Sequence, residues 1–321
     1  MINSVNPGAA AMGEVSVSSF RYGVSLYSYT DDFGTVMTLD DAFDHVADTG
    51  STGIEILGET SVPLYPEPPV AWIDDWFAKL ERYQLEPTNF ACWVDTRIQI
   101  DRNMSVEEGA AQIAQDLRLA HKLGFRFIRP KFGVIDHDLT PDPIWEGAVE
   151  RNLDLAHQLD LVILPEIHSP TPIRHPVTDA YVKFIERTGT KNFGLMIDTG
   201  IFQDRPIDHW GGGITDEIKK GALSFLNGIN TPVEHLADVI QYVPFIQAKF
   251  HNIDENLHDH QIPWERIVPM LKKLGYAGYL SSEYEGERSA WVAIEQVRRQ
   301  HALIRKLEEE YDAAKLETAN A

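Results

Sequence analysis

Cysteine and positive charge are both scarce in this sequence. Cys92 is the only cysteine among 321 residues, so neither an intrachain disulfide nor a cysteine-based zinc cluster can form. The 49 aspartates and glutamates outnumber the 28 lysines and arginines, which gives a formal net charge of -21. Because the acidic residues are spread along the chain, their field repels phosphate backbones and anionic membranes. We therefore expect no nucleic-acid partner.

Long apolar runs are absent as well. No segment approaches the roughly 20 apolar residues that a membrane-spanning helix needs, and residues 1–19 contain no lysine, no arginine and no apolar core of a signal peptide. We therefore expect a cytoplasmic protein without membrane contact. Its expected organisation is a disordered leader over 1–19, one folded domain over 20–310, and a charged, alanine-rich tail over 311–321 that continues the last helix and then frays.

The sequence does contain eight short runs with β-strand character, most of them followed by an amphipathic stretch at helical spacing. The runs are YGVSL near Tyr22, IEIL near Ile54, PTNFACWV near Pro87, FIRPKF near Phe127, LVILPEI near Leu161, FGLMI near Phe193, IQAKFHN near Ile246 and GYLSSEY near Gly278. They start roughly 30 to 40 residues apart, except for one larger gap before the seventh. This spacing predicts an α/β fold, a single-domain (β/α)8 TIM barrel. The gap, over 201–238, predicts an enlarged loop that could cover a site.

Helix-capping signals agree with this interpretation. TLDDAFDHVADTG opens on a threonine and closes on a glycine, and SVEEGAAQIAQDLRLAHKLG opens with a Ser-x-x-Glu capping box. An open doubly wound sheet is the rival fold, but no Gly-x-Gly-x-x-Gly or phosphate-binding loop follows the first strand.

Polar residues interrupt the apolar strands at their expected carboxyl ends, where barrel enzymes carry their sites. Strands 4 to 8 offer, in order, Arg129 and Lys131, Glu166 and His168, Asp198, Lys249 and His251, and Glu283 and Glu285. Residues two apart on a strand point to the same side, so these pairs can face one central cavity. Three carboxylates and an imidazole from consecutive strands suit one divalent ion, whereas the carboxylates alone would repel one another. We therefore predict a metal site at the carboxyl ends of strands 5 to 8.

Four of these strand ends carry a family resemblance. PEIH, MIDTG, KFHNID and LSSEYEG resemble strands 5 to 8 of the xylose-isomerase-like barrels, the sugar isomerase and epimerase superfamily, and the likeness extends from about Arg21 onward. It implies one divalent ion, preferably Mn²⁺ with Co²⁺, Mg²⁺ or Zn²⁺ as alternatives, held by Glu166, Asp198, His251 and Glu283. The spacing leaves Glu285 as an alternative ligand to Glu283, although the strand position favours Glu283.

The sequence also departs from two branches of that superfamily. Keto-sugar 3-epimerases resemble it less, because Ser169 and Pro170 stand where they usually carry Asn-Arg, and Ile201 stands where they carry a histidine. The DNA-repair endonucleases recruit further histidines for three metals, but the third strand here offers Cys92 and Asp95.

A narrower resemblance is to the large subunits of bacterial C-glycoside deglycosidases, carried by Glu-x-His on strand 5, SSEYEG and the helix EQVRRQHALIRKL. It implies a hetero-oligomer with a small β-rich partner subunit, and cleavage of the carbon-carbon bond between a 3-keto sugar and an aryl aglycone. The metal would act as a Lewis acid on the ketone, and His168 would be the base that removes the neighbouring proton. Lys249 or Lys131 could support the enolate or a phenolate.

Several alternatives remain open at the level of the sequence. Arg129, Trp210 and Glu285 are candidate substrate-binding residues, although Glu285 could instead pair with Arg288. The three carboxylates could form a structural ion network with Arg129, Lys131 and Lys249, and His168 could be a supporting rather than a reacting histidine. The alternative functions are a metal-dependent sugar isomerase or epimerase and a non-catalytic sugar-binding barrel.

Overall fold

The computed structural model describes residues 20–97, 102–133, 139–204, 231–286 and 289–320. The expected leader over 1–19, Trp210, Arg288 and most of the enlarged loop lie outside these residues.

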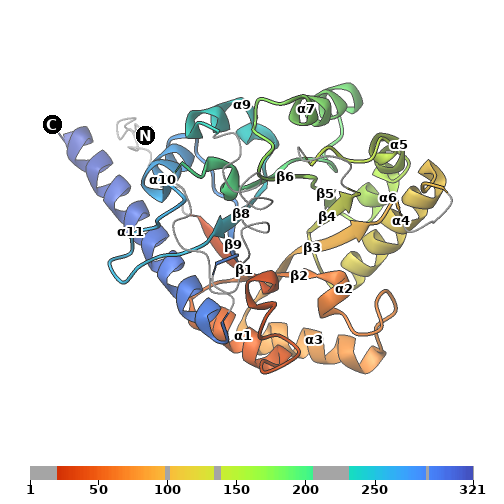
Figure 1. Cartoon of the computed structure of the whole chain (residues 1–321), viewed down its shortest axis with the longest axis horizontal. Coiled ribbons are helices and arrows are strands. Elements are labelled where there is room, and N and C mark those ends of the chain that lie inside the picture. The colour runs from red at the N-terminus through yellow and green to blue at the C-terminus, as the bar shows by residue number, and fades with distance from the viewer. Residues whose placement is uncertain (1–19, 98–101, 134–138, 205–230, 287–288, 321) are drawn as a thin grey trace, which may run out of the picture.

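One parallel sheet forms the centre of the molecule, and helices surround it (Figure 1). Its strands are β1 (Arg21–Ser25), β2 (Gly53–Leu57), β3 (Glu86–Val94), β4 (Phe127–Phe132), β5 (Val162–Ile163), β6 (Glu166–Ile167), β7 (Met196–Asp198), β8 (Phe245–Phe250) and β9 (Tyr279–Tyr284). They are hydrogen-bonded in the order β5-β4-β3-β2-β1-β9-β8-β7-β6. Since β5 and β6 belong to one run of the chain, the two ends of this order meet and close a barrel. The predicted (β/α)8 TIM barrel is confirmed.

The fifth strand run is divided into β5 and β6 at Pro165, which has no N–H to give to a neighbouring strand. Before the break, Leu164 donates its N–H to the Ile128 carbonyl of β4 at 2.8 Å. After it, the Pro165 carbonyl accepts from the Met196 N–H of β7 at 3.0 Å. The run therefore pairs with β4 in its first half and with β7 in its second, which sets Glu166 beside the end of β7.

The outer layer consists of helices of very different length. They are α1 (Leu39–Asp48), α2 (Gly58–Ser61), α3 (Val70–Tyr83), α4 (Val106–Lys122), α5 (Trp145–Glu150), α6 (Leu153–Gln158), α7 (Pro176–Thr188), α9 (Leu236–Val239), α10 (Trp264–Lys273) and α11 (Val292–Asn320), with 3-10 turns at Leu26–Tyr29, Thr199–Phe202, Val233–His235 and Ile240–Tyr242. Thr38 and Ser105 cap α1 and α4 through complete capping boxes with Asp41 and Glu108. The helix α11 includes residues 311–320, so the fraying expected there stays a prediction. No helix in the described part of the chain is long and apolar enough to cross a membrane.

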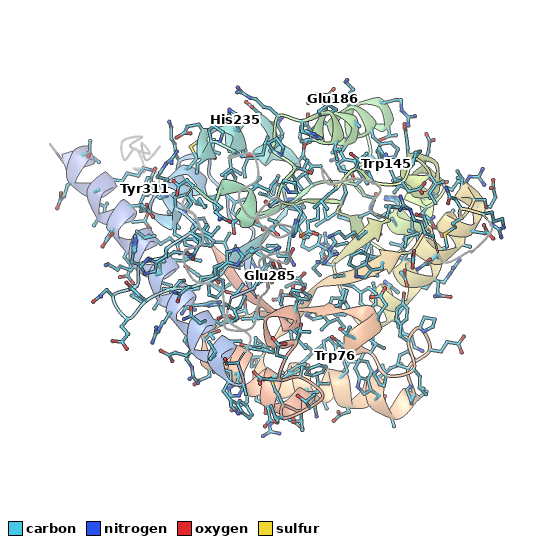
Figure 2. The ribbon with its side chains drawn as sticks, viewed as in Figure 1. Trp76, Trp145, Glu186, His235, Glu285 and Tyr311 are labelled. Atoms are coloured by element: carbon cyan, nitrogen blue, oxygen red, sulfur yellow. The ribbon has the colours of Figure 1, made fainter. Side chains whose placement is uncertain are left out.

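The apolar core has two parts. The larger part lies between the sheet and the helices, where Trp76 and Trp145 are surrounded by other aromatic rings. The smaller part fills the amino-terminal end of the barrel interior with Leu164, Met196, Phe245 and Tyr279. Figure 2 shows both tryptophans in the helical layer and Glu285 near the centre of the ring of strands.

Candidate functional site

Asp198, the last residue of β7, is buried and held in one orientation. Its Oδ1 accepts the Gly200 N–H at 2.6 Å. A Cβ on Gly200 would lie 2.9 Å from that same oxygen and 3.1 Å from Cδ of Lys249, so glycine is what permits this tight turn. The second oxygen, Oδ2, is buried and faces the Lys249 ammonium, whose Nζ lies 2.7 Å away. A buried carboxylate oxygen held this way and neutralised by a cation suits a cation site.

Three side chains from β6, β7 and the segment after β6 form a candidate metal site. The ligand atoms of Glu166, His168 and Asp198 all lie within 4.8 Å of one another, and His168 Nε2 is 3.5 Å from Asp198 Oδ2. The period-two spacing of Glu166 and His168 thus brings both toward Asp198, as the sequence predicted. His168, predicted as the base, here belongs to the group of possible ligands.

The hydrogen bonds of His168 fix which ring nitrogen is basic. Nδ1 lies 2.5 Å from the carbonyl oxygen of Ser169, and because a carbonyl can only accept, Nδ1 must carry the proton. Nε2 then has the lone pair, and the Lys249 ammonium donates to it at 2.6 Å. Burial, reinforced by the Lys249 charge, holds the pKa of His168 below its usual value. A neutral imidazole with its Nε2 toward the cluster can bind a metal or accept a proton.

The Lys249 ammonium lies at the meeting point of this cluster. Nζ is 2.7 Å from Asp198 Oδ2, 3.3 Å from Glu283 Oε2 and 3.3 Å from Glu285 Oε1. Burial acts to lower the pKa of Lys249, but these carboxylates, Asp198 first, outweigh it and raise the pKa well above the usual range. Lys249 therefore supplies one positive charge among converging carboxylates that would otherwise repel one another.

Glu283, on β9, is linked to a second layer of buried polar residues beneath the cluster. The Gln247 side-chain N–H₂ donates to Glu283 Oε1 at 2.7 Å and to Glu55 Oε1 at 3.1 Å. Glu55 also accepts from Asn89 at 2.9 Å and from Ser281 at 2.8 Å. Burial raises the pKa of Glu55 to about 7 and that of Glu283 well above its usual range, although the Lys249 charge opposes the latter shift. Glu283 Oε2 is a second buried carboxylate oxygen of the cluster, and it faces the Lys249 ammonium at 3.3 Å.

Arg129 and Lys131 of β4 flank the other side of the cluster. Arg129 Nε lies 3.7 Å and Lys131 Nζ 4.0 Å from Glu166 Oε2. Burial would raise the pKa of Glu166, but the nearby cations, Arg129 foremost, outweigh it and hold that pKa well below the usual range. Burial also lowers the pKa of Lys131. Glu166 is thus an ionised carboxylate beside two cationic side chains.

His251 and Glu285 lie at the outer edge of the same strands. Nδ1 of His251 lies 3.0 Å from the Glu285 carbonyl oxygen, so its Nε2 carries the lone pair. Burial lowers the pKa of His251, whereas the Lys249 charge outweighs burial and holds the pKa of Glu285 at about 2. In the described part of the chain, the group with mutually close ligand atoms does not include His251 or Glu283. The four-residue ligand set implied by the resemblance therefore stays a prediction.

Sequence reasoning left two features of the site without a role. Glu55 was not assigned and Gln247 was not considered, yet together they support Glu283 from below. The signal was available, because Gln247 stands two residues before Lys249 on a strand whose alternate residues face inward. Trp93 of β3 is 41% exposed.

Comparisons with known proteins agree with the fold. The family described as xylose isomerase-like TIM barrels matches residues 43–307. The chain is 28% identical to the 3'-dehydrocarminate deglycosidase alpha subunit of a Microbacterium species, over 91% of this chain and 97% of that protein. It is 26% identical to a C-glycoside deglycosidase alpha subunit of Arthrobacter globiformis, over 92% and 94% of the two chains.

A solved structure shows the same architecture at lower sequence identity. An L-ribulose 3-epimerase superposes with a TM-score of 0.64 and 16% identity, over 94% of this chain and 99% of that one. At that identity the likeness extends to the fold.

Proposed function

Because the chain belongs to the xylose isomerase-like TIM barrel family, we propose that it is the metal-dependent barrel subunit of a C-glycoside deglycosidase. The proposed reaction is a lyase reaction that cleaves the carbon-carbon bond between a 3-keto sugar and an aryl aglycone. The observation that carries the proposal is the neutral His168, whose Nε2 lies 3.5 Å from Asp198 in a cluster with Glu166. The deglycosidase alpha subunits that cover most of the chain support it.

The metal would be held by Glu166, Asp198, His251 and Glu283. The buried oxygens of Asp198 and Glu283 that face the Lys249 ammonium fit this role, because a cation already balances their charge, and hard carboxylate oxygens with imidazole nitrogen suit Mn²⁺, with Co²⁺, Mg²⁺ or Zn²⁺ as alternatives. When bound, such an ion supplies Lewis-acid polarisation of the sugar ketone. A bound ion would compete with the Lys249 ammonium for these oxygens of Asp198 and Glu283, since both are cations.

His168 is the proposed base. Its Nε2 takes the proton from the sugar carbon next to the ketone, and Nδ1–H keeps the ring in place by donating to the Ser169 carbonyl. The electron pair of the broken C–H bond forms the double bond toward the carbon that carries the aryl group. The carbon-carbon bond to the aglycone then breaks, and the aryl carbon receives a proton, so the products are an unsaturated keto sugar and the free aglycone.

The two lysines are the candidate donors in this scheme. Lys249 lies beside His168, and where a bound ion takes its place at the carboxylates, its ammonium would be free to stabilise negative charge on the sugar. Lys131 lies at the side of Glu166 and can stabilise a phenolate on the departing aglycone. Arg129 and Glu285 are proposed to bind sugar hydroxyls, and Trp210, which lies outside the described residues, remains a proposed substrate contact.

The relatives are alpha subunits, so we propose that this chain works with a small β-rich subunit in a hetero-oligomer. We also propose a cytoplasmic location, in keeping with a lone, buried, free Cys92.

The test is an assay of the purified chain on an aryl 3-keto C-glycoside, with and without the small subunit encoded beside it. The proposal predicts release of the free aglycone that requires the partner and a divalent ion, and loss of release in His168→Gln. An isomerase or epimerase would instead interconvert keto sugars without the partner. A non-catalytic sugar-binding barrel would bind the sugar and release nothing.

A further inference from the structure

Trp93 stands near the carboxyl end of β3, on the strand face that looks into the barrel. Asn89, four residues earlier on the same face, reaches the barrel interior and donates to Glu55. Phe90, Cys92 and Val94, which alternate with this row, are buried on the opposite face. Trp93 therefore extends the inward-facing row to the mouth, where the residue is 41% exposed.

The backbone of Trp93 is fixed from both sides. Its N–H donates to Glu59 Oε1 at 2.6 Å, and its carbonyl accepts from Gln112 Nε2 at 2.6 Å. Since β2 ends at Leu57, the Glu59 carboxylate takes the place of the next strand carbonyl. An exposed aromatic ring on a backbone held in this way is a preorganised surface, which loses little conformational freedom when a ligand binds.

Lys131 joins this ring to the catalytic cluster. The two residues are register partners on β3 and β4, and Lys131 Nζ lies 5.0 Å from the centroid of the Trp93 ring and 4.0 Å from Glu166 Oε2. In the described part of the chain its ammonium makes no closer polar contact than this ion pair. Its N–H groups are thus available to an oxygen of a bound ligand, one side chain away from Glu166.

We propose that Trp93 and Lys131 form the subsite for a planar phenolic ring, the aglycone half of the substrate. The ligand ring packs on the exposed part of the Trp93 indole, and its phenol oxygen accepts a hydrogen bond from Lys131. Flat aromatic ligands favour such offset contacts with tryptophan, and the charged donor fixes their orientation. This inference rests on the proposed function, because it names the group that the cleaved bond releases.

Isolated exposed tryptophans are common on protein surfaces, and the chain offers one as a matched control. Trp291 is 47% exposed, and its backbone N–H is held by Asp32 at 3.0 Å. It lies next to His45 rather than near the strand-end cluster.

The experiment measures binding of a free planar flavonoid, without sugar, to the full chain in complex with its small subunit, by titration calorimetry. We expect Trp93→Ala to weaken binding about 10-fold, Trp93→Phe to weaken it less than about threefold, and Trp291→Ala to leave it unchanged. Unchanged affinity in Trp93→Ala overturns the subsite, as does an equal loss in Trp291→Ala. Trp93→Phe controls for misfolding of the alanine variant. If the subsite exists, the Trp93→Phe variant must bind the flavonoid more tightly than the Trp93→Ala variant does.

A second readout separates this inference from the proposed function. If the complex releases aglycone but Trp93→Ala has an unchanged KM for the aryl substrate, the subsite is wrong and the deglycosidase stands. If flavonoid binding depends on Trp93 but no C-glycoside is cleaved, the subsite stands and the proposed function fails.

Discussion

The two ends of the barrel interior are built from the same strands and have opposite chemistry. At the amino-terminal end, Leu164, Met196, Phe245 and Tyr279 form a closed apolar cluster. Two residues further along each strand, at the same inward spacing, stand Glu166, Asp198, Gln247 and Ser281. Buried apolar side chains stabilise a fold wherever they pack, whereas buried charges cost free energy unless they are paired. The apolar end therefore serves stability, and the other end carries the candidate site.

A substitution at the charged end should reduce turnover far more than it reduces stability. We expect His168→Gln to reduce aglycone release by about 10³-fold, equivalent to roughly 4 kcal/mol, because the proton acceptor is lost. The free energy of unfolding should change by less than about 1 kcal/mol, since His168 is only partly buried. Single-turnover assays and urea unfolding measure the two effects. A variant that keeps normal turnover would remove His168 from the role of base.

The apolar end should show the reverse pattern. Phe245→Ala removes a fully buried ring from the cluster and should lower the free energy of unfolding by about 3–4 kcal/mol. Phe77→Ala is the control, because that ring is 42% exposed and its loss should cost about 1 kcal/mol or less. Urea denaturation compares them. Equal losses would mean that the cluster is not a core.

A buried histidine that contacts β9 from α11 allows a third comparison, of stability at different pH values. His301 of α11 is buried and contacts Ser282 Oγ at 2.8 Å, and burial lowers its pKa to about 3. Its stabilising contribution should be complete above the unfolded pKa of about 6.5. It should be lost as the pH falls toward 3, by roughly 3 kcal/mol between pH 6.5 and 4.

The measurement is urea unfolding of the wild type and His301→Gln at several pH values. The stability difference between the two proteins should shrink as the pH falls through this window. A difference that stays constant would show that the His301 pKa is not depressed.

The smallest predicted effect concerns the layer between the two ends. Gln247→Leu removes the N–H₂ group that donates to both Glu283 and Glu55, and we expect about 10-fold weaker metal binding, roughly 1.4 kcal/mol. Gln300→Leu is the control, since that buried amide donates to the Ala248 carbonyl at 2.8 Å and has no contact with Glu283. Mn²⁺ titration of the metal-free variants compares them. Equal Mn²⁺ affinities of the two variants would show that Gln247 does not support the metal site.

Much of the fold followed from local pattern. Eight apolar runs at regular spacing, one capping box and one threonine cap identified the barrel, because strand periodicity and helix capping depend on neighbouring residues. The division of the fifth run at Pro165 was visible as a proline within an apolar run, but the change of partner from β4 to β7 depends on the closed sheet.

The candidate site was predictable in composition and less so in arrangement. Inward-facing positions at strand ends identified Glu166, His168 and Asp198, which the structure brings together. The central position of the Lys249 ammonium, by contrast, depends on the length and direction of a flexible side chain, which the sequence does not fix.

The most direct test of the account is the metal content of the purified chain, measured by mass spectrometry after Mn²⁺ loading and desalting. Asp198→Asn removes a carboxylate from the cluster, and Asp116→Asn, a buried carboxyl on α4, is the matched control. The account predicts one ion per chain in the wild type and in Asp116→Asn, and none in Asp198→Asn. A wild type that retains no metal, or an Asp198→Asn variant that retains it fully, would contradict it.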